Sequence, residues 1–341
     1  MVAVDDTGHG GSALQEERRT SNFVHHRDYR AMGSRIELIA VGVDNATADL
    51  ALAAAREFAE GWEERFSRFR PQSELSRLNE SAGRPMPVSP GFLAVLEAAL
   101  AAYKRTDGLF DPSILPSLTA LGYDRDFREV QSSPEIARRI VPEPGLVERI
   151  AIDRRAGTVT LQPGCALDFG GIAKGIFVDR LVERFAAWPG GSINAGGDLR
   201  VWGEPPDGDR WVVGIEDPVD ADRERCLLSI LDPAAGSIAT SAMNRHVWQR
   251  GTERYHHLID PATGRPVLGR IVSATALAPD LATAEVATKA LLVSGGRGMS
   301  LNPADASGAV VIDITGTLLA VPGRFPDAFA IHPLDSDGRA A

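Results

Sequence analysis

The chain has 341 residues, of which 44% are hydrophobic and 24% are charged, a composition typical of a folded protein with a buried core. Its 36 basic and 46 acidic residues give a net charge of −10, so no excess of positive charge is present to attract nucleic acid. The two cysteines, Cys165 and Cys226, are too few for a disulfide framework and lack the paired spacing of a zinc site. No stretch approaches the roughly 18 uncharged apolar residues of a membrane span, so we expect no spanning segment.

The two ends of the chain differ in composition from the rest. Residues 1–24 contain acidic, glycine and serine residues where an export signal would have a basic segment followed by an apolar core. We predict a disordered lead-in over residues 1–24, one folded domain over 25–335 and a short tail over 336–341. Because we find neither a signal nor a lipid-attachment cysteine, we expect the protein to be cytoplasmic.

Hydrophobic patterning predicts the elements between these ends. Alternating apolar residues predict strands, in chain order, over residues 29–43 (interrupted at Gly33-Ser34), 150–153, 158–162, 192–203, 211–217, 227–232, 237–241, 254–260, 308–314 and 317–321. Apolar residues at helical spacing predict helices over 45–69, 90–104, 172–188 and 280–294. We expect a proline-rich loop over 109–127 and a surface excursion over 128–147. Strands in antiparallel pairs beside a few longer helices indicate an α+β fold.

A glycine-rich turn precedes the third predicted helix. In the run DFGGIAKG, from Asp168 to Gly175, two glycines at a strand-to-helix turn leave backbone N–H groups open to a phosphate or pyrophosphate. The residue order matches neither a P-loop nor a dinucleotide fingerprint. Glycines chosen only for close packing are the alternative. Lys174 favours a binding role, because this chain has only three lysines, Lys104, Lys174 and Lys289.

Two further motifs carry polar residues that suit a binding site. In NAGGD, Asn194 and Asp198 flank a glycine pair inside a predicted strand, which indicates either close approach of a ligand or a tight hairpin. His256 and His257 precede a turn, and alternation along the strand directs their rings to opposite faces. One ring can then enter a site while the other faces solvent. A structural role is the alternative, and the spacing alone does not decide between them.

The last predicted helix contains an unusual pair of charges. Within LATAEVATKALLVSGG the only charged residues are Glu285 and Lys289, and apolar residues occupy nearly every direction around the helix. Such a helix is expected to be buried, so its charges must pair or bind a ligand. A surface ion pair along one exposed stripe is the alternative.

Taken together, these motifs resemble one family, the FAD:protein FMN transferases of the ApbE type. The matching segments occur in the family's order: YRAMGS (29–34), FSRFRPQSELSRLN (66–79), GLFDP (108–112), LGYD (121–124), DFGGIAKG (168–175), NAGGD (194–198), ATS (239–241), HLIDPATG (257–264) and AE (284–285). The resemblance implies a single ApbE-type α+β domain that holds FAD in a cleft. It also implies transfer of FMN from FAD to a Ser or Thr hydroxyl of a partner flavoprotein, with release of AMP and normally with magnesium.

The same resemblance implies roles for individual residues. His257 and Lys174 would be catalytic, with His257 near the transferring phosphate. The residues that would bind FAD are Met32, Phe69, Leu109, Phe110, Asp111, Asp168, Gly171, Lys174, Asn194, Asp198 and Leu258. A magnesium ion would lie on the carbonyl of Ala173 and on Glu285.

One position departs from the family pattern. The family usually places a second metal ligand, Thr or Asp, four residues after the first, whereas this chain has Lys289 there. An ammonium cannot ligate a metal. Two interpretations follow: Lys289 supplies the positive charge in place of magnesium, or the metal stays on Glu285 and Ala173 while Lys289 turns aside. The same departure supports a competing function, an FAD carrier without transferase activity. A third hypothesis is an FAD pyrophosphatase that yields FMN and AMP.

Overall fold

The computed structural model describes residues 24–335, except 131–133, 135, 136, 138–141, 144, 208, 221, 233, 235, 300, 301, 303 and 304. Apart from residue 24, the predicted lead-in and the predicted tail lie outside the described residues, as does much of the predicted excursion over 128–147. In the part of the chain that the structure describes, no helix combines the length and the apolar character needed to cross a membrane.

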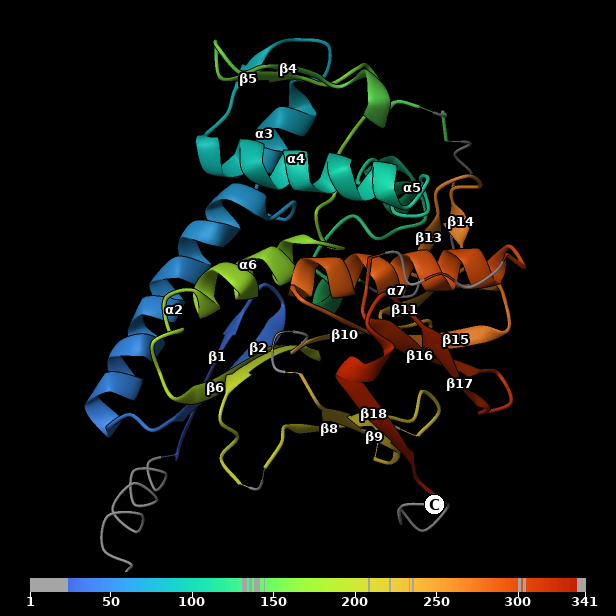
Figure 1. The fold of residues 1–341 in the computed structure, drawn as a ribbon. Coiled ribbons are helices and arrows are strands. Elements are labelled where there is room, and N and C mark those ends of the chain that lie inside the picture. The colour runs from blue at the N-terminus through green and yellow to red at the C-terminus, as the bar shows by residue number, and fades with distance from the viewer. Residues whose placement is uncertain are drawn as a thin grey trace, which may run out of the picture.

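An eight-stranded sheet forms the middle layer of the molecule (Figure 1). Every neighbouring pair in this sheet is antiparallel. Its strands, in spatial order, are β1 (Val24–Ala31), β2 (Ser34–Val41), β6 (Gly190–Ala195), β7 (Asp198–Gly203), β10 (Ser237–Ala242), β15 (Ile271–Ala278), β16 (Gly308–Asp313) and β17 (Leu318–Pro322). The predicted α+β class is therefore confirmed.

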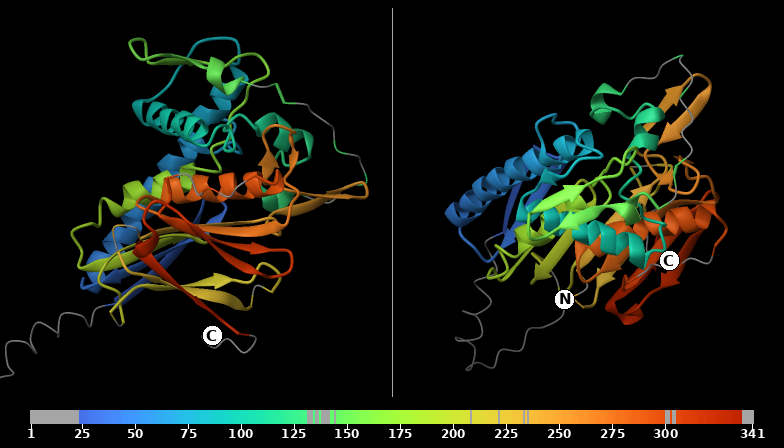
Figure 2. Two further views of the ribbon diagram at one scale, coloured as in Figure 1. Left: turned by 45° about the vertical axis from the view of Figure 1, so that its right-hand side comes forward. Right: turned by 90° about the horizontal axis from the view of Figure 1, so that it is seen from above.

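Helices cover one face of this sheet and a smaller sheet covers the other, as Figures 1 and 2 show. The helices are α2 (Asn45–Phe66), α3 (Glu74–Glu80), α4 (Pro90–Arg105), α5 (Leu115–Ala120), α6 (Ala173–Val182) and α7 (Leu281–Gly296). The smaller sheet contains β8 (Val212–Glu216), β9 (Glu224–Ile230) and β18 (Phe329–Pro333). A separate apolar cluster that includes Val201, Ile215 and Leu228 joins the two sheets.

Short elements complete the chain around the helical side. A three-stranded sheet contains β3 (Met86–Pro87), β4 (Ala151–Asp153) and β5 (Thr158–Thr160), and two hairpins are β11 (Val247–Arg250) with β12 (Glu253–His256) and β13 (Ile259–Asp260) with β14 (Arg265–Pro266). Single turns of 3-10 helix lie at Phe127–Glu129, Val147–Arg149 and Pro326–Ala328.

Several predicted elements differ from the structure. The strand expected over 192–203 is the hairpin of β6 and β7, and the strand expected over 254–260 is interrupted between β12 and β13. The strand expected over 29–43 is a hairpin, because Met32 and Gly33 adopt positive φ angles of 52° and 69° and reverse the chain. The loop expected over 109–127 contains α5, whose second residue is a proline, which suits a first helical turn because its missing N–H has no helical partner there. The helix expected over 172–188 ends at Val182. The terminal hairpin at residues 315–316 is confirmed.

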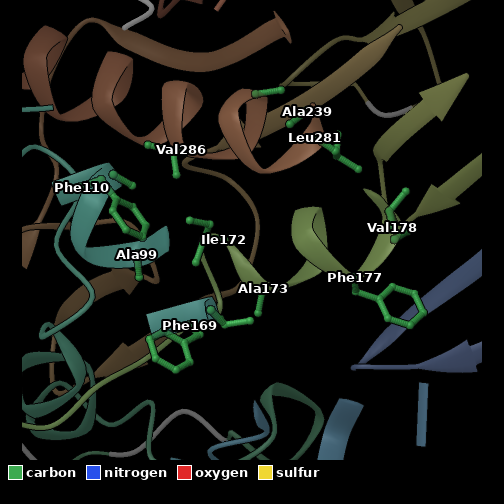
Figure 3. Close-up of a cluster of buried hydrophobic side chains, with 14 of the residues drawn as sticks. Ala99, Phe110, Phe169, Ile172, Ala173, Phe177, Val178, Ala239, Leu281 and Val286 are labelled. Carbon is green, nitrogen blue, oxygen red and sulfur yellow. The ribbon is translucent and has the colours of Figure 1, made fainter. Parts of the chain in front are cut away.

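The main core lies between the large sheet and its helices. Figure 3 shows part of it: Phe169 and Ile172 precede α6, Phe177 belongs to α6, and Leu281 and Val286 belong to α7. All five side chains are at most 3% exposed. This packing fixes α6 and α7 against each other at the place where the predicted site residues gather.

Candidate active site

Glu285 is the centre of the site. It lies in the second turn of α7, is fully buried, and is surrounded by the buried residues of that helix. Its Oε2 accepts a hydrogen bond of 2.9 Å from the backbone N–H of Gly175, and its Oε1 lies 3.3 Å from Nζ of Lys289 and 3.7 Å from Nζ of Lys174. The predicted buried and paired charge is confirmed, and the alternative of a surface ion pair is excluded.

Lys174 joins this carboxylate to a second one. It is the second residue of α6, and its ammonium forms an ion pair with Asp198 at the start of β7. The side chain of Asp198 is only 4% exposed, whereas that of Lys174 is 25% exposed. Burial lowers the pKa of Lys174, but the charges of Asp198 and Glu285 outweigh it and raise that pKa above its ordinary value. Lys174 is therefore a permanent cation at the mouth of the site.

The glycine turn before α6 approaches the same charges. A Cβ on Gly171 would lie 3.0 Å from the ring of Phe110 and 3.6 Å from Cε of Lys289, so the glycine lets both side chains come close to the backbone. The helix that follows has ten residues, and the positive end of its dipole at this place favours an anion. The expected open N–H groups are mostly occupied: Gly170 donates to Asp168, Ile172 and Ala173 donate to the carbonyl of Phe169, and Gly175 donates to Glu285. Positive side-chain charge and the helix dipole therefore meet at this turn.

Gly175 in α6 allows this helix to pack closely against α7, and a substitution at this glycine tests that packing. A Cβ at this position would lie 2.6 Å from the backbone N and Cα of Ala282 in α7. We expect Gly175→Ala to lower the free energy of unfolding by about 1–3 kcal/mol, because one of the two helices must shift. Gly61→Ala in α2 is the control, since a Cβ there meets no atom within 4 Å, and it should stabilise by about 0.5–1 kcal/mol. Urea unfolding measures both, and equal stability of the two variants would contradict the expected clash.

The NAGGD motif forms a tight hairpin between β6 and β7. Gly196 and Gly197 have φ angles of 68° and 100°, and Oδ1 of Asn194 accepts a hydrogen bond of 2.8 Å from the N–H of Gly197. The amide of Asn194 also donates to Glu37 on β2 at 3.0 Å. The sequence allowed a close approach by a ligand or a tight hairpin, and the structure shows the hairpin. The hairpin places Asp198 within contact of Lys174. Binding of FAD by Asn194 and Asp198 stays a prediction.

The two adjacent histidines have different environments. His256 is buried and its Nε2 lies 3.1 Å from the carbonyl of Val267. The Nδ1 of His257 lies 3.1 Å from the carbonyl oxygen of Arg245, which can only accept, so Nδ1 carries the proton and Nε2 is left with a lone pair. Burial, followed by the charges of His246 and Lys289, lowers the pKa of His257 well below its usual value. His257 is therefore neutral at pH 7.

His246 is a site residue that the sequence motifs did not indicate. It has a positive φ of 46°, its ring centroid lies 5.0 Å from that of His257, and burial together with the charge of Lys174 lowers its pKa. The positive charge of Lys174 helps lower the pKa of His246, and that of Lys289 helps lower the pKa of His257. A single histidine in an irregular loop belongs to no recognisable sequence motif, so the sequence alone does not identify it as a site residue.

The exposed aromatic residue Phe69 is positioned by Arg68, whose guanidinium stacks between two aromatic rings. The guanidinium of Arg68 lies 4.2 Å from the ring centroid of Phe69 and 4.4 Å from that of Tyr123. Nε of Arg68 pairs with Oδ2 of Asp168 at 2.7 Å, so the predicted FAD ligand Asp168 holds this arginine. Phe69 remains 38% exposed, and Arg68 connects it to Asp168 at the start of the glycine turn, which suits a ring that receives a flat ligand.

The remaining predicted FAD-binding residues are more dispersed. Phe110 and Leu258 belong to the buried core, and Leu109 packs against that core while partly exposed. Asp111 accepts two hydrogen bonds of 2.7 Å from Ser113, and burial raises the pKa of its carboxyl group. Met32 lies in the β1–β2 turn, with its backbone N–H bonded to the carboxylate of Glu63. Their contact with FAD stays a prediction.

Similar proteins place this fold in a known class. The structure matches the crystal structure of the ApbE protein from Thermotoga maritima with a TM-score of 0.77 at 23% identity, covering 88% of this chain and 97% of that one. It also matches the flavin transferase ApbE from Vibrio cholerae with a TM-score of 0.69 at 24% identity, covering 90% and 99% of the two chains. The fold is thus that of the ApbE-type proteins.

Sequence comparison gives the family itself. The ApbE family model matches residues 32–309. The FAD:protein FMN transferase of Vibrio cholerae is 32% identical over 250 residues, which cover 71% of this chain and 73% of the relative. That of Haemophilus influenzae is 29% identical over 239 residues, or 68% of each chain. The chain belongs to the ApbE family of FAD:protein FMN transferases, and the resemblance seen in its motifs is confirmed.

Proposed function

We propose that this chain transfers FMN from FAD to a Ser or Thr hydroxyl of a partner protein and releases AMP. The observation that carries the proposal is the meeting of two ammonium groups on one buried carboxylate beside the N-terminus of α6. Lys174 and Lys289 lie 3.7 Å and 3.3 Å from the same oxygen of Glu285. The charge of Lys289 also helps lower the pKa of the neutral His257. Cleavage of a diphosphate needs positive charge around the phosphates and a base for the incoming hydroxyl.

The bound substrate would extend from this charged centre. We place the diphosphate at the glycine turn, where the N-terminus of α6 and the two lysines favour an anion. The flavin would lie toward the exposed ring of Phe69, which Arg68 holds in position. Met32 and Leu109, both partly exposed at the edge of the core, would contribute apolar contacts.

In the proposed transfer step, His257 would act as the tautomer with its proton on Nδ1, the form that can donate to the carbonyl of Arg245. The hydroxyl oxygen of the acceptor attacks the phosphorus on the FMN side, and the bond from that phosphorus to the bridging oxygen breaks. Nε2 of His257 accepts the hydroxyl proton, while the bridging oxygen leaves with AMP and keeps the bonding electrons. Lys174 and Lys289 would stabilise the negative charge that develops on the departing phosphate.

The lowered pKa of His257 predicts an unusual pH dependence. A base with an ordinary histidine pKa of about 6.5 would be half protonated and half inactive at that pH. Because the pKa of His257 lies well below this value, the imidazole stays neutral as the pH falls from 8 to 6. We therefore expect the transfer rate at saturating FAD to stay nearly constant between pH 8 and pH 6. An inflection near pH 6.5 would contradict the assignment of His257 as the base.

Product analysis tests the proposed function directly. The purified protein is incubated with FAD, with and without acceptor proteins that carry a Ser/Thr flavinylation motif. Transferase activity gives in-gel flavin fluorescence of the acceptor and an equal amount of AMP. AMP and free FMN without any acceptor would indicate a pyrophosphatase. Bound FAD with neither product, across several acceptors, would indicate a carrier and would refute transfer.

A further inference from the structure

The contacts of Glu285 leave little room for a divalent ion. Its Oε2 is bonded to the N–H of Gly175, and its Oε1 faces the ammonium groups of Lys174 and Lys289. No group of three or more His, Cys, Asp or Glu side chains that could hold a metal occurs within the described part of the chain. The residues present therefore do not fit the magnesium ion predicted on Glu285 and the carbonyl of Ala173.

Electrostatic repulsion supports this conclusion. Magnesium binds oxygen at about 2.0–2.1 Å and requires nearly octahedral geometry. An ion at that distance from Oε1 of Glu285 would lie no more than about 6 Å from either ammonium nitrogen, given the 3.3 Å and 3.7 Å contacts. Both carboxylates of the cluster, Glu285 and Asp198, are already neutralised by these two lysines. A further two positive charges would find no free carboxylate here.

We infer that the ammonium of Lys289 takes the place of a divalent metal at the diphosphate, so that this chain binds FAD and transfers FMN without magnesium. This inference rests on the proposed function and assigns the charge that stabilises its transition state. It makes Lys289 a substrate-binding residue rather than a structural partner of Glu285.

Lys289 has the reach and the free donors that this role requires. Its side chain is 18% exposed, so it extends from the buried helix α7 to the open side of the site. Its Cε is near Gly171 in the turn that would receive the phosphates. An ammonium has three N–H donors, and the structure records one of them on Glu285. Among the described residues no acceptor is recorded for the other two, so they can bind phosphate oxygens at the glycine turn as part of one compact charge.

FAD titrations in excess EDTA and in excess MgCl2 test the inference. For the wild-type protein, the two dissociation constants should agree within about threefold, a difference of less than 1 kcal/mol. Lys289→Thr replaces the ammonium with an oxygen ligand. In EDTA it should bind FAD about tenfold or more weakly, the loss expected for one charge-assisted contact, and magnesium should restore its affinity. Lys104→Thr, at an exposed lysine of α4, is the control and should bind FAD like the wild type.

The outcomes separate this inference from the proposed function. Wild-type FAD binding and acceptor labelling that both persist in EDTA support it. Binding or labelling that appears only with magnesium overturns the inference but leaves transferase activity intact. FAD binding in neither condition overturns both. If Lys289→Thr does not fold, the wild-type comparison still decides, and a magnesium ion found on Glu285 in a crystal structure of the FAD complex would refute the inference.

Discussion

Replacing His257 with glutamine should slow FMN transfer by about 100- to 10,000-fold, the contribution of a positioned general base. The affinity for FAD should change little, because the proposed role of His257 concerns the acceptor proton rather than the bound diphosphate. Glutamine keeps a polar group near the carbonyl of Arg245 but offers no basic nitrogen. The rate of fluorescent labelling at saturating FAD measures the first effect, and an FAD titration measures the second.

A second histidine provides the control for this variant. His332 lies on β18, in the small sheet on the opposite face of the large sheet, and its Nε2 lies 3.0 Å from the hydroxyl of Ser229. His332→Gln should label the acceptor at the wild-type rate. Wild-type labelling by His257→Gln as well would remove His257 from the proposed mechanism.

Lys174→Ala should reduce both stability and FAD affinity. It leaves the carboxylate of Asp198, only 4% exposed, without its cation, and breaking a buried ion pair costs about 3–5 kcal/mol. Because Lys174 itself is 25% exposed, we expect a loss near the lower value, about 3 kcal/mol of unfolding free energy. FAD should bind about tenfold or more weakly, because one cation at the diphosphate is removed.

The double variant Lys174→Ala/Asp198→Asn separates these two effects. Asparagine removes the unpaired buried charge, so the double variant should recover part of the lost unfolding free energy in urea denaturation. Its FAD affinity should remain as low as that of Lys174→Ala, because the cation is still absent. Recovery of FAD binding would show that Lys174 serves only to neutralise Asp198.

Local patterns predicted most of the fold correctly, and the errors have physical causes. The helix over 280–294 could be recognised because its apolar residues face every direction, and the structure buries it as α7. The hairpin at Met32-Gly33 was missed because a non-glycine residue seldom adopts the positive φ of 52° that reverses the chain there. The shortened helix α6 ends without a sequence break before Pro189, so its apolar spacing alone overestimated its length.

The site shows a similar division between local and distant information. Burial and pairing of Glu285 followed from its surroundings on one helix, and its partner Lys289 from the four-residue spacing. Its contact with Lys174 and the ion pair of Lys174 with Asp198 join three separate segments, which no local pattern relates. The stacking of Arg68 between the rings of Phe69 and Tyr123 could not be predicted from the sequence for the same reason.

The hydrogen bond from Gly175 to Glu285 also bears on the order in which the molecule assembles. The two residues are 110 positions apart in the chain, so this contact closes a long loop and is slow to form compared with the local hairpins. A nascent chain that has emerged only as far as β15 has the glycine turn and Lys174 but lacks Glu285 and Lys289. The full set of charges proposed to hold the diphosphate is therefore assembled only after α7 has been synthesised and has docked against α6.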